Sequence, residues 1–217
     1  MSMPDVDKTR IYIFGISEGG YGSQRLASFY ADYWAAAGPM AGGEIPSDAP
    51  AENCGHIGFS LRTGANDFMF ARDLLTTRTH ELFDSLQQCY PTEYRHHVEL
   101  IPGRGHGIDY SPTTPWLSYF TRIVHPRHFV WEDFPMDGIY RRGFYNIAIH
   151  ERDTIGGNER TRYEMTVRDN TIELTIVIPA EGPSLGTAPS GTCTWISFSA
   201  NSSYVIPVSS GCALIYW

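Results

Sequence analysis

The sequence predicts an α/β fold in which a parallel sheet with flanking helices is followed by a smaller β-rich unit. Short apolar runs alternate with helical stretches over the first half of the chain, a pattern typical of parallel βαβ units. Helical periodicity is then lost, and β-branched and aromatic residues become frequent. We therefore expect two domains, residues 1–124 and 125–217, although one large domain is almost equally compatible with this length.

Four strands and three helices are predicted in the first unit. The strands are residues 10–14, 36–41, 57–63 and 98–101. The helices are residues 22–37, 72–88 and 116–124. Ligand sites in parallel sheets lie beyond the carboxyl ends of the strands, so the loops after these strands are where functional side chains are expected.

The second unit is predicted to consist of strands. Four of them are residues 128–134, 144–150, 163–167 and 171–178, and two further strands are possible up to the end of the chain. Residues 168–170 are suited to the turn of a hairpin, and apolar side chains alternate along 171–178. Aromatic residues in this unit favour a packed core, with an exposed sugar-binding platform as the alternative; they are Trp131, Tyr140, Phe144, Tyr145 and Trp195.

Composition excludes several classes of partner. Hydrophobic residues make up 42% of the chain, which is sufficient for a packed core. The net charge of −8 and the lack of a basic stripe argue against a nucleic-acid partner. No stretch approaches the roughly 20 apolar residues needed to span a bilayer. The four cysteines lack C-x-x-C spacing, so no zinc site is predicted from them.

One motif indicates a catalytic function: residues 15–19 match G-x-S-x-G and lie between a predicted strand and a predicted helix. Flanking glycines allow a sharp turn that projects the serine hydroxyl above the sheet. A serine hydroxyl is a poor nucleophile until a base takes its proton, and the base needs a carboxylate to orient it. The motif therefore predicts Ser17 as a nucleophile with two partners further along the chain.

His106 is the best candidate for the base. It lies between two glycines in loop 102–111, directly after the predicted strand 98–101. The other seven histidines have structural explanations. Three of them are expected on or near a helix surface: His80, His96 and His97.

Asp67 is the best candidate for the acid, because it follows the predicted strand 57–63 and precedes His106. In enzymes with such a serine turn, the acid and then the histidine follow along the chain. Competing aspartates either fall in a predicted helix or come after the histidine: Asp73, Asp84 and Asp109. Each residue also has a purely structural alternative. Ser17 could be a surface serine in a turn, His106 could only hydrogen-bond to backbone, and Asp67 could belong to an ordinary Asn-Asp turn.

The motifs G-I-S-E-G-G-Y-G-S, A-A-A-G-P-M-A-G-G, R-T-G-A-N-D and I-P-G-R-G-H together resemble the later half of an α/β-hydrolase, over about residues 8–124. Within that superfamily the chain is most similar to esterases of the polyhydroxybutyrate depolymerase and dienelactone hydrolase kind. The resemblance implies a serine esterase with Ser17 as nucleophile, Asp67 as acid and His106 as base. It implies the amide of Glu18 as an oxyanion donor, with Gly19 beside it at the substrate. The implied substrate is a small-molecule or polymeric ester, and no metal or organic cofactor is needed.

The chain departs from the family pattern at its start, since only residues 1–9 precede the first predicted strand. Family members have several strands there, one of which supplies the second oxyanion amide, whose loss costs on the order of 3 kcal/mol. We therefore expect the C-terminal portion of a longer domain, with a free sheet edge that favours association. The rival function is a catalytically silent binding module with a relic triad, and a peptidase of related fold is a third possibility.

Overall fold

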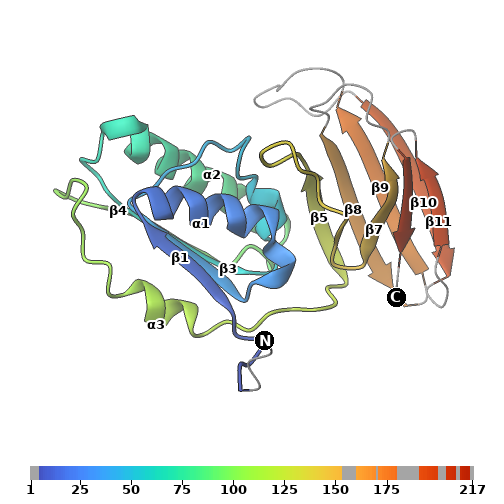
Figure 1. The fold of residues 1–217 in the computed structure, drawn as a ribbon, viewed down its shortest axis with the longest axis horizontal. Helices are drawn as coiled ribbons and strands as arrows, with labels where there is room; N and C mark the ends of the chain where they lie inside the picture. The colour runs from blue at the N-terminus through green and yellow to red at the C-terminus, as the bar shows by residue number, and fades with distance from the viewer. Residues whose placement is uncertain are drawn as a thin grey trace. The chain divides into compact units, whose positions relative to one another are not determined.

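The computed structural model describes residues 5–152, 160–169, 171–179, 191–199, 204–208 and 211–215. The chain divides into two compact units, Met1–Ile123 and Val124–Trp217 (Figure 1). Within the described residues, no helix combines the length and the apolar character needed to cross a membrane. The two units are described separately below.

The first unit is a four-stranded parallel sheet with strand order β1-β2-β3-β4. Its strands are β1 (Tyr12–Ile16), β2 (Ala36–Met40), β3 (Gly58–Gly64) and β4 (His96–Ile101). The helices around it are α1 (Glu18–Phe29), α2 (Arg72–Cys89) and α3 (Thr113–Leu117), with short 3-10 turns at Ala31–Tyr33, Ala51–Cys54 and Met69–Ala71 (Figure 1). The predicted α/β fold with a parallel sheet is confirmed for this unit.

The core of this unit lies between the two central strands and the helices. β2 and β3 are buried along their whole length, as expected for parallel strands covered on both faces. Phe59 of β3 stacks on Phe83 of α2, with 4.4 Å between ring centroids. At Gly38 of β2, a Cβ would lie 2.6 Å from the Thr113 side chain, so this glycine lets α3 approach the sheet closely.

Two predicted helices differ from the observed ones. The helix expected at 22–37 begins earlier, at Glu18, and ends at Phe29. Three glycines near its start are poor helix formers, but one of them, Gly20, is buried against the backbone of Met40 and Gly42, where a larger residue would not fit. The helix expected at 116–124 is the shorter α3, which ends at Leu117. His96 and His97, expected on or near a helix surface, do not belong to a helix: both are in β4, from which the His96 side chain reaches Asp84 of α2.

The second unit contains two antiparallel sheets, ordered β10-β9-β8-β5 and β11-β12-β7-β6. Their strands are β5 (His128–Asp133), β6 (Gly143–Phe144), β7 (Ile147–Arg152), β8 (Thr161–Arg168), β9 (Thr171–Pro179), β10 (Gly191–Ser199), β11 (Tyr204–Val208) and β12 (Gly211–Ile215). β8 and β9 form the predicted hairpin, with Arg168 opposite Thr171. The predicted turn residue Asn170 and the end of the chain at Trp217 lie outside the described residues.

Aromatic side chains fill the space between the two sheets of this unit. Trp131 of β5 stacks on Phe144 of β6 and on Tyr163 of β8, with ring centroids 5.5 and 5.0 Å apart. All three side chains are buried. They therefore form a core and not an exposed platform, while the side chain of Trp195 lies outside the described residues.

Candidate active site

Ser17 occupies a one-residue turn between the end of β1 and the start of α1. Its backbone has φ 58° and ψ −117°, a conformation that L side chains rarely adopt and that costs on the order of 1–3 kcal/mol. Two hydrogen bonds hold the turn: the Ser17 amide donates to the Met40 carbonyl at 2.9 Å, and the Tyr21 amide donates to the Ser17 carbonyl at 3.1 Å. The strained backbone points the serine side chain out of the sheet edge, as the motif predicts.

Two of the glycines around the turn, Gly15 and Gly20, are required by close backbone contacts. A Cβ at Gly15 would lie 2.2 Å from the carbonyl oxygen of Gly19, and one at Gly20 would lie 2.5 Å from that of Met40. A Cβ at Gly19 itself would meet nothing within 4 Å. The first glycine of the motif thus allows α1 to start against β1, whereas the second leaves space open beside Ser17.

The Gly15→Ala variant is expected to lower the free energy of unfolding by about 1–3 kcal/mol, because backbone atoms must move apart to admit the methyl group. Gly22→Ala on α1 is the control, since nothing lies within 4 Å of a Cβ there. Urea unfolding of both variants measures the difference. Equal stability of the two would contradict the steric role given to Gly15.

Asp67 lies in the loop after β3 and is buried, with 3% of its surface exposed. Its amide donates to the carbonyl of Gly64 at 3.0 Å, which closes a tight turn at the strand end. Arg72, the first residue of α2, donates from Nη1 to Oδ1 of Asp67 at 3.1 Å. Sequence reasoning missed Arg72, although an arginine at a helix start, five residues after the acid, was available as a signal.

The loop that carries His106 is joined to the loop that carries Asp67. The Ala65 amide donates to the Ile101 carbonyl at 2.9 Å, and the Asn66 amide donates to the Arg104 carbonyl at 2.8 Å. A Cβ at Gly64 would lie 2.0 Å from the carbonyl oxygen of Gly105, so the two loops touch through their backbones. Backbone contacts therefore fix the position of the histidine relative to the acid.

The structure brings Ser17, Asp67 and His106 together from three loops at the carboxyl end of the sheet. Nδ1 of His106 lies 2.7 Å from Oδ2 of Asp67, and its Nε2 lies 3.0 Å from Oγ of Ser17. A neutral imidazole whose Nδ1–H donates to the carboxylate has a lone pair on Nε2. The imidazole can then accept the serine proton. The His106 side chain is 45% exposed, so the reacting atoms are open to solvent.

The competing side chains lie elsewhere or have other roles. Asp73 and Asp84 belong to α2. Asp109 accepts hydrogen bonds from the hydroxyl and amide of Ser111, which hold its pKa below the usual value. Burial raises the pKa of the Cys54 thiol far above its ordinary range, so Cys54 stays a neutral thiol and is no rival nucleophile.

Glu18 and Gly19 are the first two residues of α1, and both are exposed next to Ser17. Amides in the first turn of a helix have no partner within the helix, and the helix dipole adds positive potential at this end. A negative charge that develops beside Ser17 Oγ would meet this end of α1. The position of Glu18 is thus compatible with the oxyanion role that the family resemblance implies.

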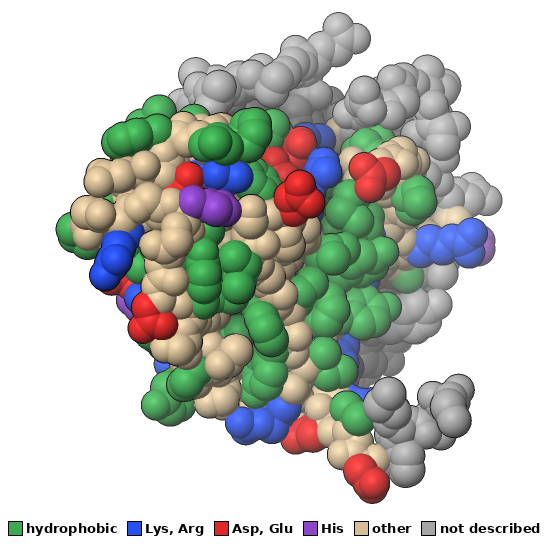
Figure 2. Space-filling view, turned by 60° about the vertical axis from the view of Figure 1, so that its left-hand side comes forward, with side chains coloured by type: hydrophobic (Ala, Val, Ile, Leu, Met, Phe, Trp, Pro, Cys, Tyr) green, Lys and Arg blue, Asp and Glu red, His purple; other side chains and the backbone are tan. Residues whose placement is uncertain are grey.

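Apolar side chains next to the triad residues in the chain are exposed, and hydrophobic side chains are visible over much of the face drawn in Figure 2. Ile16 precedes Ser17 and is 45% exposed, and Phe68 follows Asp67 and is 67% exposed. Phe70 is also exposed, and its ring lies 5.1 Å from the guanidinium of Arg72. Exposed apolar side chains therefore flank Ser17 and Asp67 in the chain.

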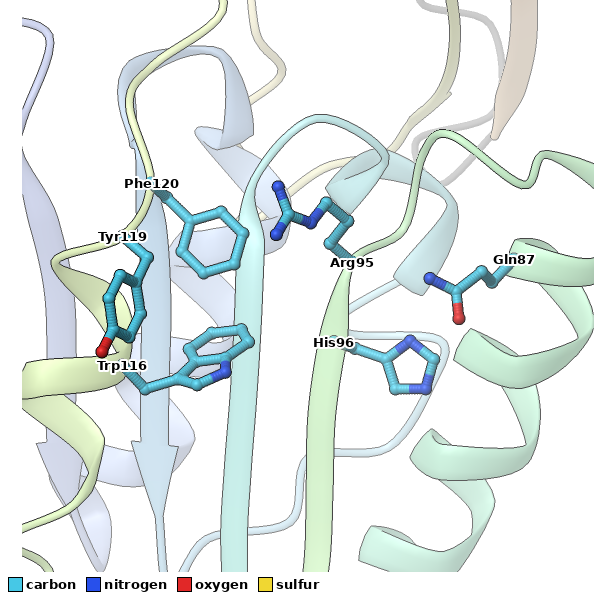
Figure 3. A pocket seen from close by; sticks show the side chains of 6 residues that line it. All are labelled: Gln87, Arg95, His96, Trp116, Tyr119 and Phe120. Atoms are coloured by element: carbon cyan, nitrogen blue, oxygen red, sulfur yellow. The ribbon is translucent and has the colours of Figure 1, made fainter.

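A surface pocket lies away from this constellation, near the amino end of β4 (Figure 3). Its lining residues come from α2, β4, the residue before β4, and the segment from Trp116 to Phe120. They are Gln87, Arg95, His96, Trp116, Tyr119 and Phe120. None of the predicted triad residues belongs to this pocket, since all three lie beyond the opposite ends of their strands.

Comparison with known proteins does not assign this chain to a family. No protein-family model and no curated protein matches the chain. A solved structure described as a thermostable esterase aligns with 54% of this chain and 32% of its own, at 23% sequence identity and a TM-score of 0.42. This chain therefore spans about a third of the length of that esterase. The evidence for a function therefore comes from the geometry of the three side chains and not from similar proteins.

Proposed function

We propose that residues 1–124 are the later part of an α/β-hydrolase domain and hydrolyse carboxylic esters through an acyl-serine intermediate. In this proposal Ser17 is the nucleophile, His106 the general base and Asp67 the acid that orients it. The single observation that carries the proposal is the unbroken chain of hydrogen-bond distances, 2.7 Å from Asp67 to His106 and 3.0 Å from His106 to Ser17.

The proposed mechanism begins when Ser17 Oγ attacks the ester carbonyl while Nε2 of His106 takes the hydroxyl proton. The tetrahedral oxyanion is stabilised by the Glu18 amide at the positive end of α1. His106 returns the proton to the leaving alcohol, and the acyl group remains on Ser17. Water then attacks the acyl-serine while His106 takes its proton, the bond between the acyl carbon and Ser17 Oγ breaks, and His106 returns the proton to Oγ as the carboxylic acid leaves. Asp67 holds the imidazole throughout and steadies its positive charge.

Two further features support this assignment. The strained φ of Ser17 is the kind of backbone outlier that persists where a side chain must be held in a demanding position. The Arg72 guanidinium donates a hydrogen bond to Oδ1 of Asp67, so the other oxygen, Oδ2, is left for His106. Exposed apolar side chains beside the triad suit the acyl or alkyl part of an ester substrate, whether a small molecule or a polymer.

Labelling with a fluorophosphonate probe tests the proposal, because such probes react with a serine hydroxyl only when a base activates it. The full chain is expected to be labelled at Ser17, and Ser17→Ala to remain unlabelled. Ser85→Ala is the matched control, since that hydroxyl donates to the Glu81 carbonyl on the exposed side of α2. Absence of labelling in a folded protein would overturn the enzyme assignment and favour a binding module.

A further inference from the structure

A second cluster of side chains lies between α2 and β4, apart from the triad. His80 and Asp84 are one helical turn apart on α2, with Nε2 of His80 3.7 Å from Oδ2 of Asp84. Nε2 of His96, on β4, lies 3.1 Å from Oδ1 of Asp84. The three side chains can each direct one ligand atom to a common point, with these atoms all within 4.8 Å of one another.

The hydrogen bonding of His96 indicates what this cluster binds. Its Nδ1 lies 2.8 Å from the Tyr94 carbonyl oxygen, while its Nε2 faces the Asp84 carboxylate. Both partners are acceptors, but a neutral imidazole carries only one N–H. A metal cation at Nε2 would leave Nδ1–H to donate to the Tyr94 carbonyl. The His96 side chain is only 6% exposed.

A metal ion satisfies every group in this arrangement. Metal-binding histidines commonly donate their other N–H to a backbone carbonyl, which fixes the ring and its tautomer, as Tyr94 does here. Zinc bound at about 2.0–2.1 Å by imidazole nitrogen and carboxylate oxygen, in a tetrahedron, holds its ligand atoms about 3.4 Å apart. The observed separations of 3.1 and 3.7 Å run to different oxygens of Asp84 and lie on either side of that value. With one ligand atom from each residue, all three atoms lie within 4.8 Å of one another, so small side-chain movements would close the site around an ion.

We infer that His80, Asp84 and His96 form a binding site for one divalent transition-metal ion of the zinc type. The site is open on one side, because His80 and Asp84 are 48% and 54% exposed, and water would complete the coordination. Two histidines and one carboxylate suit zinc better than calcium or magnesium, which take oxygen ligands. The sequence predicts no metal site from its cysteines, and this cluster contains none.

The place of the site in the fold gives it a structural role. Figure 3 shows the imidazole of His96 projecting from β4 toward the helix that carries Gln87, which is α2. A bound ion would cross-link α2 to β4 at the end of the unit opposite to the triad. Asp84 follows Arg72 by twelve residues on α2, a distance of about 18 Å along the helix. We therefore expect the ion to stabilise the first unit without taking part in ester hydrolysis.

Titration of the metal-stripped full chain with Zn²⁺ tests the inference by calorimetry and by thermal unfolding. One tightly bound ion is expected, with a rise of several degrees in the unfolding temperature of the chain. His80→Ala and Asp84→Asn are each expected to weaken Zn²⁺ binding at least about 10-fold, since even groups that only support a metal ligand cost 10–100-fold when changed. His80 is 48% exposed, so the stability of His80→Ala without metal should stay close to that of the unchanged chain.

Three controls keep the test specific. His97→Ala removes the neighbouring, half-exposed histidine of β4 and should leave Zn²⁺ binding unchanged. Cobalt bound in place of zinc should give visible bands without a sulfur charge-transfer band, and Cys89→Ser should still bind, because Cys89 is an exposed thiol on the same helix. Failure to bind Zn²⁺, binding that survives both His80→Ala and Asp84→Asn, or sulfur ligation would each overturn the inference.

Discussion

Replacing Ser17 or His106 by alanine is expected to lower kcat/KM for an activated ester by at least about 10⁴-fold, and replacing both is expected to lower it no further. The reason is that the hydroxyl and the imidazole act as one unit across the 3.0 Å between Oγ and Nε2. Once either group is gone, the remaining one has no partner with which to move the proton. Steady-state hydrolysis of a nitrophenyl ester by the three variants measures this dependence.

The control variants replace a serine and a histidine by alanine at positions outside the proposed active site. Ser85→Ala and His97→Ala alter exposed side chains on α2 and β4 and should keep the rate of the unchanged chain. Additive losses in the double variant would show that Ser17 and His106 contribute separately. That result would contradict the proposed triad even if each single variant were slow.

The proximity of Ser17, Asp67 and His106 could be predicted because parallel sheets place the loops after their strands at one edge. The order of the strands in the sheet is also their order in the chain, so Ser17, Asp67 and His106 needed only to follow a strand end to meet. The sequence could not show that Asp67 would be buried. Nor could it show which cation would accompany that carboxylate, since Arg72 lies on the next helix and its direction depends on packing.

The errors in the predicted helix and strand boundaries have local causes. Gly19 and Gly20 made the start of α1 look unlike a helix, although buried backbone contacts demand glycine at position 20. The histidines at 96 and 97 follow a long helix closely in the chain, which concealed that they begin β4. The same mistake hid the cluster of His96 with His80 and Asp84. Those three residues converge only when α2 packs against β4.

Replacing Arg72 by methionine is expected to lower the free energy of unfolding of the first unit by about 3–5 kcal/mol, because it leaves a buried carboxylate without its cation. Asp67 and Arg72 have side chains that are only 3% and 6% exposed, so water cannot replace the guanidinium. Methionine keeps most of the length of the side chain. The loss therefore reports the charge and its hydrogen bond more than a cavity, and urea unfolding measures it.

A double-mutant cycle with Asp67→Asn separates the pair from the packing around it. Asp67→Asn with Arg72→Met removes both charges, so the double variant should be more stable than the sum of the two single losses implies, by about 1–3 kcal/mol. Arg78→Met is the matched control: Arg78 pairs with Glu81 on the exposed face of the same helix, and such pairs contribute at most about 1 kcal/mol. If Arg72→Met and Arg78→Met cost the same, Arg72 does not hold the acid in place. The backbone contacts between the two loops would then position Asp67 alone.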